Sequence, residues 1–288
     1  MPFDVTQLFF IAQGVSIELG VPWFRNLVNS VYSDHDGVQI YVLRNQGQAV
    51  AALPVLVNSK LALSQEVRSL SNFYTSLYSP LICEGVSAND MASLLSTIRK
   101  DHASLATFRF APMDPESSGY RILMEAFRTI GLIPFGFFCF GNWYQPVQED
   151  WPTYLKNREG TTRSTIKRMK KKFAADGGTL SLVLGGENLE KGLAAYEHVY
   201  AKSWKVPEPY PMFVPGLMRT CAENGWLRLG LAWLDGQPIA AQIWIVINNK
   251  ANIYKLAYDE NFRSYAPGTL LTAMLMEHAI VQDMVLEV

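Results

Sequence analysis

The sequence predicts an α+β protein made of two similar halves, each with a mostly antiparallel sheet flanked by helices. In the second half, three segments rich in β-branched and aromatic residues precede an apolar segment of helical length. In the first half, strand-like and amphipathic segments alternate. The segments GQAVAALPVLV from Gly47 and GQPIAAQIWIV from Gly236 match at five of eleven positions, which indicates an internal repeat.

The length and composition bound the class of protein. A chain of 288 residues that is 49% hydrophobic has enough material for two domains, which we expect over residues 1–145 and 146–288. No apolar run reaches the roughly 18 residues of a membrane span, and the first residues lack the basic start of a signal peptide. The three cysteines, Cys83, Cys139 and Cys221, have neither disulfide nor metal-ligand spacing. We therefore expect a cytoplasmic protein with no bound metal.

The first half contains a regular succession of elements. A hairpin is expected around Asn45-Gln46-Gly47, because turn residues there separate two runs of strand-forming residues. The predicted elements are a helix over 18–33, strands over 38–44 and 49–57, a strand or extended segment over 66–82, a helix over 89–101, a strand over 105–111, a helix over 118–130 and a strand over 133–140.

The segment between the halves is strongly basic. Between Arg158 and Lys172 there are seven basic residues and one acidic residue, whereas the rest of the chain has 18 basic and 25 acidic residues. Asp150 can cap a short helix that begins at Pro152, and a basic helix follows from about Thr161. Its charge suits a phosphate-bearing cofactor, an RNA acceptor stem or an anionic surface polymer, or it is simply a solvated helix face.

The second half is dominated by the stretch from Leu227 to Ile280. Three strands over 227–234, 238–247 and 251–258 are expected to form a meander, with an Asp235-Gly236 turn. A helix should follow over 269–280, and a last strand over 284–288. Before this stretch we expect a strand over 179–186 and helices over 188–205 and 217–224.

The loop between the third strand and the helix has the features of an anion site. A helix N-terminus presents unpaired backbone N–H groups and the positive end of the helix dipole. Arg263 can add a fixed charge, and Gly268 allows a ligand to approach the backbone.

This loop, Arg263-Ser-Tyr-Ala266-Pro-Gly268, resembles the Q/R-x-x-G/A-x-G/A pyrophosphate loop of the GNAT N-acyltransferases. Pro267 departs from that pattern and removes one N–H donor. The chain is most similar to the FemAB-like group, which has two such domains in tandem and includes acetyltransferases associated with polysaccharide biosynthesis. The first half has no such loop after its third strand, which makes it a degenerate copy. The second copy is expected to lack its last elements, which would leave the final strand as an exposed edge and favour a homodimer.

The resemblance implies transfer of an acyl group from acyl-CoA, first of all acetyl-CoA, to an amine. The acceptor would be a small amine or an amino sugar of a polysaccharide precursor. The residues expected to bind the cofactor are Leu256, Ala257, Tyr258, Arg263, Ala266, Gly268 and Thr269.

The candidate catalytic and acceptor-binding residues come from the same half. Glu208 or Asp259 could act as general base, and Tyr210 or Tyr258 as proton donor to the leaving thiolate. Trp204 and Lys205 lie in a proline-rich loop that could cover the acceptor, although such a loop could serve packing alone.

Two polar residues interrupt the apolar strands. Strand alternation places Lys255 with Ile253 and Ala257, on the face opposite Leu256 and Tyr258. Because buried polar groups need partners, we expect Lys255 to cluster with Gln242 or Asp259 and to bind substrate, unless it only reaches water at a strand edge.

Two other functions remain open at this point. An aminoacyl-tRNA-dependent transferase would use the basic helix to hold RNA, as FemAB relatives use aminoacyl-tRNA. A non-enzymatic interaction protein would retain only the fold.

Overall fold

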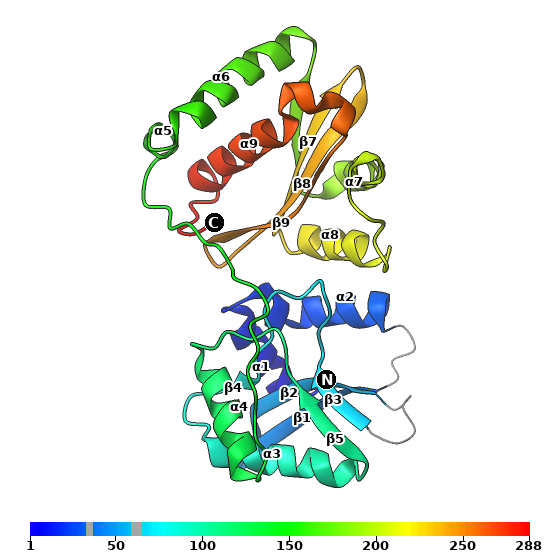
Figure 1. Ribbon diagram of the computed structural model, residues 1–288, viewed down its shortest axis with the longest axis vertical. Coiled ribbons are helices and arrows are strands. Elements are labelled where there is room, and N and C mark those ends of the chain that lie inside the picture. The colour runs from blue at the N-terminus through cyan, green and yellow to red at the C-terminus, as the bar shows by residue number, and fades with distance from the viewer. Residues whose placement is uncertain (33–36, 59–64) are drawn as a thin grey trace. The chain divides into compact units, whose positions relative to one another are not determined.

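The computed structural model describes residues 1–32, 37–58 and 65–288. The chain divides into two compact units, Met1–Gly141 and Asn142–Val288, which are described in turn (Figure 1). Ser33, the last residue of the first predicted helix, lies outside the described residues. Within the described ranges, every helix is too short or too polar to cross a bilayer.

The N-terminal unit is a mixed sheet between helices. Its elements are α1 (Phe3–Gln13), η1 (Ile17–Leu19), α2 (Val21–Val31), β1 (Val38–Asn45), β2 (Gln48–Asn58), β3 (Gln65–Ser69), β4 (Leu81–Ile82), α3 (Ala88–Asp101), β5 (Leu105–Arg109) and α4 (Ser118–Thr129). The sheet order is β1-β2-β3-β5, with β4 beside β2. The β3–β5 pair is parallel and the other pairs are antiparallel.

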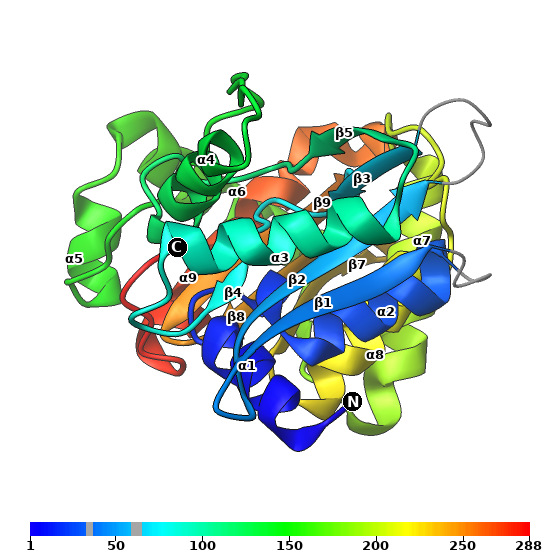
Figure 2. The ribbon, with the colours of Figure 1, turned by 90° about the horizontal axis from the view of Figure 1, so that it is seen from below.

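The core of this unit follows from the alternation of β2. Ala51, Leu53, Val55 and Val57 point to the face that α3 and α4 cover, and all four are buried. Helix α1 packs on β2 from the other face (Figure 2). A central strand that is apolar on both faces is therefore covered on both sides.

One prediction for this unit is wrong, and another is refined. The expected strand over 133–140 does not form, and its side chains are exposed, with Phe137 at 85%. A strand needs a neighbouring strand to bond to, and none in the described part of the unit runs beside this segment. The segment over 66–82, expected as a strand or an extended segment, contains two short strands, β3 and β4. The loop between them turns to bury Tyr78, whose hydroxyl donates to the Pro54 oxygen at 2.7 Å.

The C-terminal unit has an antiparallel four-stranded sheet in the order β6-β7-β8-β9. Its elements are α5 (Trp151–Lys156), α6 (Gly160–Ala175), β6 (Thr179–Val183), η2 (Gly186–Asn188), α7 (Leu189–Lys202), α8 (Phe213–Glu223), β7 (Leu227–Leu234), β8 (Gln237–Ile247), β9 (Lys250–Tyr258), η3 (Glu260–Tyr265) and α9 (Pro267–Val281). Figure 1 shows α9 on one face of the sheet, with α6 outside it, and α7 on the other face. The predicted α+β fold is confirmed.

Glycines let helices approach the sheet closely on both faces. A Cβ atom at Gly230 in β7 would lie 2.9 Å from Leu275 Cδ1 of α9. A Cβ atom at Gly192 in α7 would lie 2.8 Å from Leu229 Cδ2 of β7. A methyl group at either position would force the facing leucine side chain to shift.

The internal repeat extends to backbone conformation. The turn residues Gln46 and Gly47 have φ of 48° and 81°, and Asp235 and Gly236 have φ of 50° and 76°. Both hairpins also have a register shift at the equivalent place, after Leu43 in β1 and after Ala232 in β7. The two units thus share the turn type and the bulge as well as the five matching residues.

The last residues are paired rather than exposed as an edge. Leu286 N–H donates to the Asn249 oxygen at 2.7 Å, and Ala251 N–H donates to the Glu287 oxygen at 2.9 Å. On the other side, Val147 N–H donates to the Leu286 oxygen at 2.9 Å. The predicted strand over 284–288 is thus reduced to isolated bridges at Glu287, and the expected uncovered edge, with its reason for a homodimer, does not occur there.

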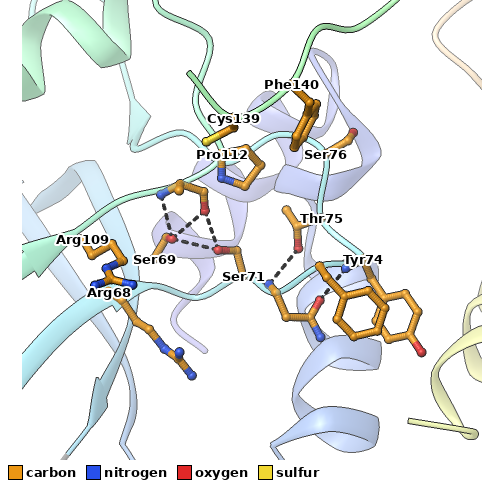
Figure 3. Close-up of a pocket in the computed structure, with 13 residues that line it drawn as sticks. Arg68, Ser69, Ser71, Tyr74, Thr75, Ser76, Arg109, Pro112, Cys139 and Phe140 are labelled. Carbon is orange, nitrogen blue, oxygen red and sulfur yellow. Dashed lines mark hydrogen bonds between the residues drawn. The ribbon is translucent and has the colours of Figure 1, made fainter. Parts of the chain in front are cut away.

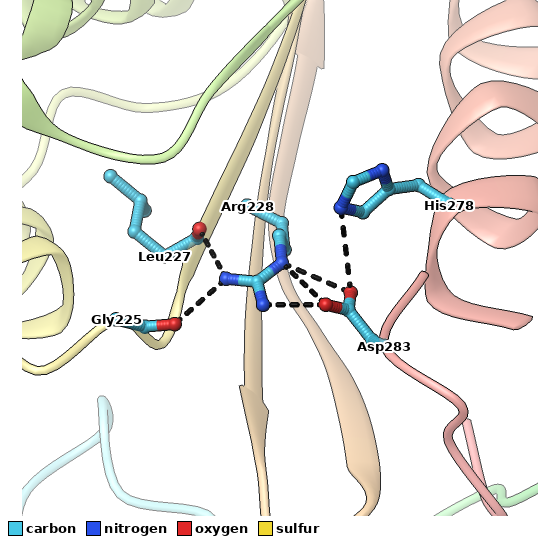
Figure 4. A network of polar contacts seen from close by, with 5 residues as sticks. All are labelled: Gly225, Leu227, Arg228, His278 and Asp283. Carbon is cyan, nitrogen blue, oxygen red and sulfur yellow. Dashed lines mark hydrogen bonds and ion pairs between the residues drawn. The ribbon is translucent and has the colours of Figure 1, made fainter. Parts of the chain in front are cut away.

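An ion pair fastens the segment after α9 to the sheet (Figure 4). Arg228 of β7 donates to Asp283 through Nη2 at 2.6 Å and through Nε at 3.0 Å. The His278 Nε2 atom lies 3.8 Å from Asp283 Oδ2. The Arg228 and Asp283 side chains are only 13% and 8% exposed, so the pair is largely desolvated.

Candidate functional site

The loop between β9 and α9 presents a helix N-terminus to solvent. Ala266 adopts the left-handed conformation, with φ 48° and ψ 48°, and turns the chain into α9 at Pro267. The N–H groups of Gly268 and Thr269 fall in the first helical turn, where N–H groups have no intrahelical acceptor. A Cβ atom at Gly268 would meet only Tyr258 Cδ1, at 3.9 Å, so the space in front of this backbone is open.

The basic helix α6 packs against this loop. Tyr265 of η3 donates its hydroxyl to Asp176 Oδ2 at 2.9 Å, and its ring lies 5.7 Å from that of Phe173. The Lys172 Nζ atom lies 4.6 Å from the centre of the same ring. The hydrogen bond to the Asp176 carboxylate raises the pKa of Tyr265. Lys172 is thus a second cation near the loop, in addition to the exposed Arg263.

Gln242 holds the start of α9 against the sheet. Its side chain is buried and donates to the Gly268 oxygen and to Thr272 Oγ1, each at 2.9 Å. Its own oxygen accepts from Trp244 Nε1 at 2.9 Å. Gln242 therefore holds the start of α9 from the side of the sheet, and its amide does not reach the solvent-exposed side of the β9–α9 loop.

A bulge separates Gln242 from Lys255. In the β8–β9 register, Gln242 lies opposite Leu256, Ile243 opposite Lys255 and Trp244 opposite Ile253. Neighbouring residues on one strand point to opposite faces, so Lys255 lies on the face away from Gln242. The predicted cluster of Lys255 with Gln242 is wrong, and so is the shared face of Ile253 and Lys255, because the bulge falls between them.

Lys255 pairs instead with Glu208. Lys255 Nζ lies 2.7 Å from Glu208 Oε1, and the two side chains are 18% and 12% exposed. Burial first, and then the Glu208 carboxylate, raise the pKa of Tyr200 in α7 to about 12. The Tyr200 hydroxyl donates to the Val206 oxygen at 3.0 Å. The proline-rich loop after α7 is thereby fixed over the middle of β9.

Three more predicted residues join this cluster. The rings of Trp204 and Tyr258 lie 4.9 Å apart, and Trp204 is half-exposed. The Lys205 Nζ atom lies 5.8 Å from the centre of the Trp204 ring. Burial lowers the pKa of Lys205, and the charge of Lys255 lowers it further, against the opposing effect of Glu208.

Asp259 and Tyr210 occupy different places. Asp259 is the N-cap of η3, and its carboxylate accepts the Asn261 N–H at 2.9 Å. Tyr210 lies just before α8, and its carbonyl accepts the Phe213 N–H at 3.0 Å. Of the two candidate bases, Asp259 thus caps a turn, whereas Glu208 lies in the cluster with Lys255.

The outer edge of β9 runs between the β9–α9 loop and the cluster of Lys255 and Glu208. The last residues of the chain pair with its first part, at Asn249–Ala251, and no strand in the described residues pairs with this edge beyond Ala251. Within the described residues, no strand therefore covers this edge from Asn252 to Tyr258. Leu256 is 40% exposed there, whereas Ala257 is buried.

Sequence reasoning missed Tyr200 and Asp176, and it included Lys172 only as part of the basic helix. Tyr196, Tyr200 and Trp204 recur at intervals of four residues, a spacing that places them on one side of a helix and that could have indicated Tyr200. Nothing in the sequence joins Asp176 to Tyr265, because 89 residues separate them.

Comparisons with known proteins bear on this unit. The family model of the acetyltransferase (GNAT) domain matches residues 160–286. The crystal structure of FemX superposes with a TM-score of 0.62 at 10% identity, over 93% of this chain and 81% of FemX. The C-terminal domain of a putative lysylphosphatidylglycerol synthetase from Agrobacterium fabrum has a TM-score of 0.46 at 12% identity, over 92% and 72% of the two chains. A tandem GNAT protein from the clavulanic acid pathway has a TM-score of 0.43 at 12% identity, over 92% and 83%. The comparison with curated proteins found no match.

At 10% identity the FemX structure shows a shared fold and nothing more, whereas the family model concerns the sequence of one unit. Among residues 1–32, 37–58 and 65–288, no group of three or more His, Cys, Asp or Glu side chains is placed to hold a metal. Residues 160–286 of the C-terminal unit are therefore similar in sequence to an acetyltransferase (GNAT) domain, on the α+β fold that the order of the elements predicts.

Proposed function

We propose that the protein is a GNAT-type N-acyltransferase that moves the acyl group of an acyl-CoA, acetyl-CoA first of all, to an amine acceptor. One observation carries the proposal. Three features follow one another along β9 and α9. They are a helix N-terminus with open backbone N–H groups, the outer edge of β9, which no strand in the described residues covers beyond Ala251, and a buried carboxylate–ammonium pair. This order matches the succession of pyrophosphate, linear arm and reactive end in an acyl-CoA.

The loop residues fit the pyrophosphate. Gly268 and Thr269 would donate backbone N–H groups, and the positive end of the α9 dipole favours an anion there. The exposed Arg263 and the nearby Lys172 would add charge. Gly268 has room in front of it that a side chain would fill, which is the feature that most favours a ligand at this backbone.

The linear arm of the cofactor would follow the outer edge of β9. An extended arm can exchange hydrogen bonds with the open backbone groups from Asn252 to Tyr258. Leu256 and Tyr258 would contact it from the strand.

The Glu208 cluster would act on the acceptor. The thioester supplies an activated acyl group when the cofactor is bound. Glu208 would accept the proton of the acceptor amine, and Lys255 orients its carboxylate through the 2.7 Å contact. Tyr200, with its pKa near 12, keeps its proton and remains a hydrogen-bond donor. Tyr258, which lies against Trp204, is the proton donor that we propose for the leaving thiolate.

The acceptor would enter beside Trp204 and Lys205. A half-exposed indole offers a flat surface to the C–H face of a sugar, which suits an amino sugar or a polysaccharide precursor. Because acyl-CoA is an intracellular donor, we place the reaction in the cytoplasm.

A thermal-shift titration tests the cofactor. CoA and acetyl-CoA are added to the wild type, to Arg263→Ala and to Arg219→Ala, a surface arginine of α8 that serves as the control. A ligand at a hundredfold excess over its Kd stabilises the native state by about 2.7 kcal/mol. We expect a clear upward shift for the wild type and the control and a smaller one for Arg263→Ala. If no protein shifts, CoA is not the donor.

A second candidate is an aminoacyl-tRNA-dependent transferase, and the exposed basic face of α6 favours it. Arg163, Lys167, Arg168, Lys170 and Lys171 are exposed, whereas Met169 and Phe173 are buried. The helix therefore offers a row of cations beside the α9 loop, as an RNA acceptor stem would require.

Salt dependence separates the two donors. Binding of tRNA should weaken steeply with salt, and a Lys167→Gln/Lys171→Gln variant should lower the slope of log K against log salt by about 0.7 to 0.9 for each lost phosphate contact. Binding of neither CoA nor tRNA would favour an interaction protein that retains only the fold.

A further inference from the structure

The N-terminal unit contains a hollow of about 550 Å³ at the ends of β3 and β5 (Figure 3). β3 and β5 are parallel, so their carboxyl ends lie at one edge of the sheet. The loops that follow them, from Ser71 to Ser76 and at Ala111–Pro112, form its walls together with Phe140. Ligands commonly bind at such an edge, because the loops there can turn polar groups towards one point.

Two arginines lie side by side at this hollow. Arg68 of β3 and Arg109 of β5 are directly opposite each other in the strand register, and both line the hollow. Like charges at opposed positions destabilise a sheet unless an anion lies between or beside them. Glu66 supplies one negative charge, with its Oε1 atom 3.0 Å from Arg109 Nε. Of the two arginine charges, one therefore remains without an acidic partner among the described residues.

Arg68 carries that excess charge. Its Nε atom is buried, and no group in the described residues accepts a hydrogen bond from it. The Nδ2 atom of Asn72, on the adjoining loop, is likewise buried without an acceptor in the described part of the chain. Buried donors without acceptors are unfavourable, and more so when they are charged.

The remaining polar groups of the wall already have partners. The Ser69 and Ser71 hydroxyls lie 2.8 Å apart, and each donates to the Ala111 oxygen, at 2.8 Å and 2.6 Å. Asn72 Oδ1 accepts the Tyr74 N–H at 2.9 Å. The hollow therefore offers donors and positive charge but few free acceptors, a combination that selects an anion.

The rest of the wall is apolar and accessible. Pro112 and the half-exposed Phe140 border the hollow, as does Phe73 at 61% exposure. Glu18 fixes the loop behind them, because its carboxylate accepts from Ser76 N and Leu77 N at 2.8 Å and 2.7 Å. A preformed hollow with an apolar side and a cationic end is typical of small-molecule sites.

We infer that the N-terminal unit binds a small molecule whose phosphate or carboxylate group lies on Arg68, Arg109 and Asn72 and whose planar or apolar part lies against Phe140 and Pro112. The site is separate from the acyl-CoA site proposed for the C-terminal unit and does not depend on it.

Alkylation of the chain's own cysteines tests this site. Cys139 lines the hollow and is exposed, so a ligand there should slow its reaction with iodoacetamide. Cys83 is half-buried outside the hollow and serves as the reference. Cys221 is buried, and burial raises its pKa to about 12, so its reaction would report unfolding. Peptide mass spectrometry gives the three rates separately.

The probes are phenyl phosphate, benzoate and the neutral benzamide, with the wild type, Arg68→Gln and Arg121→Gln. Arg121 is an exposed arginine of α4 and is the matched control. We expect phenyl phosphate, benzoate or both to protect Cys139 but not Cys83, and benzamide to protect neither. Which anion protects identifies the head group as a phosphate or a carboxylate.

Loss of a charged hydrogen bond should weaken the affinity for the protecting probe about tenfold or more in Arg68→Gln and leave it unchanged in Arg121→Gln. Protection by benzamide equal to that by the anions, equal protection in both variants, or no protection by either anion would overturn the inference. Arg263→Ala should show the same protection of Cys139 as the wild type. Failure of the CoA titration can therefore be distinguished from failure of the anion site in the N-terminal unit.

Discussion

The Lys255 ammonium and the Glu208 carboxylate form a 2.7 Å ion pair that joins the bulged strand β9 to the proline-rich loop after α7. Both groups are mostly withdrawn from water, so each depends on the other. The pair also brings Trp204, Lys205 and Tyr258 within reach of one point on the sheet.

Glu208→Gln should separate catalysis from folding. The amide retains an oxygen for Lys255 but cannot accept a proton, so acyl transfer should fall by about 10² to 10⁴-fold. The free energy of unfolding should fall by about 1 to 3 kcal/mol, since Lys255 keeps a neutral acceptor but loses its largely buried counterion. Steady-state rates and urea denaturation measure the two effects. Asp259→Asn is the comparison, and a larger loss of rate in that variant would mean that Asp259 is the base.

Gly268→Ala should weaken cofactor binding without weakening the fold. The added Cβ would meet only Tyr258 Cδ1 at 3.9 Å, an ordinary contact, and alanine is favoured over glycine in a helix by about 1 kcal/mol. Stability in urea should therefore be unchanged or higher, whereas the affinity for CoA measured by calorimetry should fall. Gly230→Ala, which would place a Cβ 2.9 Å from Leu275, is the opposite control, with lower stability. Unchanged CoA affinity in Gly268→Ala would place the pyrophosphate elsewhere.

Arg228→Met should destabilise the C-terminal unit. The variant leaves the Asp283 carboxylate largely buried without its guanidinium partner, at a cost of about 3 kcal/mol. Arg219→Met is the matched control, because Arg219 and Glu190 are 40% and 65% exposed and such pairs contribute about 0 to 1 kcal/mol. Urea denaturation of both variants and of Arg228→Met/Asp283→Leu checks this. Equal small losses in the two single variants would show that the buried pair contributes little.

Glu18 should make stability depend on pH. Burial raises its pKa above the ordinary value of 4.5, against the hydrogen bonds from Ser76 and Leu77 that lower it. The folded protein then binds more protons than the unfolded chain between these two pKa values, so the contribution of Glu18 to stability decreases as the pH rises through that window.

The measurement is the change in the free energy of unfolding between about pH 5 and about pH 8. Glu18→Gln removes the titration and should show a smaller decrease towards high pH than the wild type. Glu84→Gln, an exposed glutamate, should behave as the wild type does. A decrease of the same size in all three proteins would exclude Glu18 as its source.

Much of the C-terminal unit could be predicted from the sequence, because its signals are local. The Asp235-Gly236 turn, the strand periods on either side of it and the proline at the start of α9 each act over a few residues. The Asp150 cap of α5 is of the same kind, with its carboxylate accepting the Thr153 N–H at 3.0 Å. The turn at Asn45-Gln46-Gly47 predicted the hairpin of the first half for the same reason.

The predictions that failed concern partners distant in the sequence. The segment over 133–140 has the aromatic composition of a strand, yet a strand forms only beside another strand. Lys255 was correctly singled out as an unusual strand residue, but its partner depended on the bulge at Tyr254 and on a loop 47 residues away. Neither can be read from alternation alone.

The sequence by itself determined the α+β class, the three-strand meander of the second half and the loop from Arg263 to Gly268, because propensity, turn chemistry and period are properties of neighbouring residues. Only the tertiary structure decided that Glu208 lies on Lys255, that Gln242 holds α9 from behind, and that Arg68 lies opposite Arg109. Those relationships arise from strand register and from the packing of helices on sheets, which join residues that the chain keeps far apart.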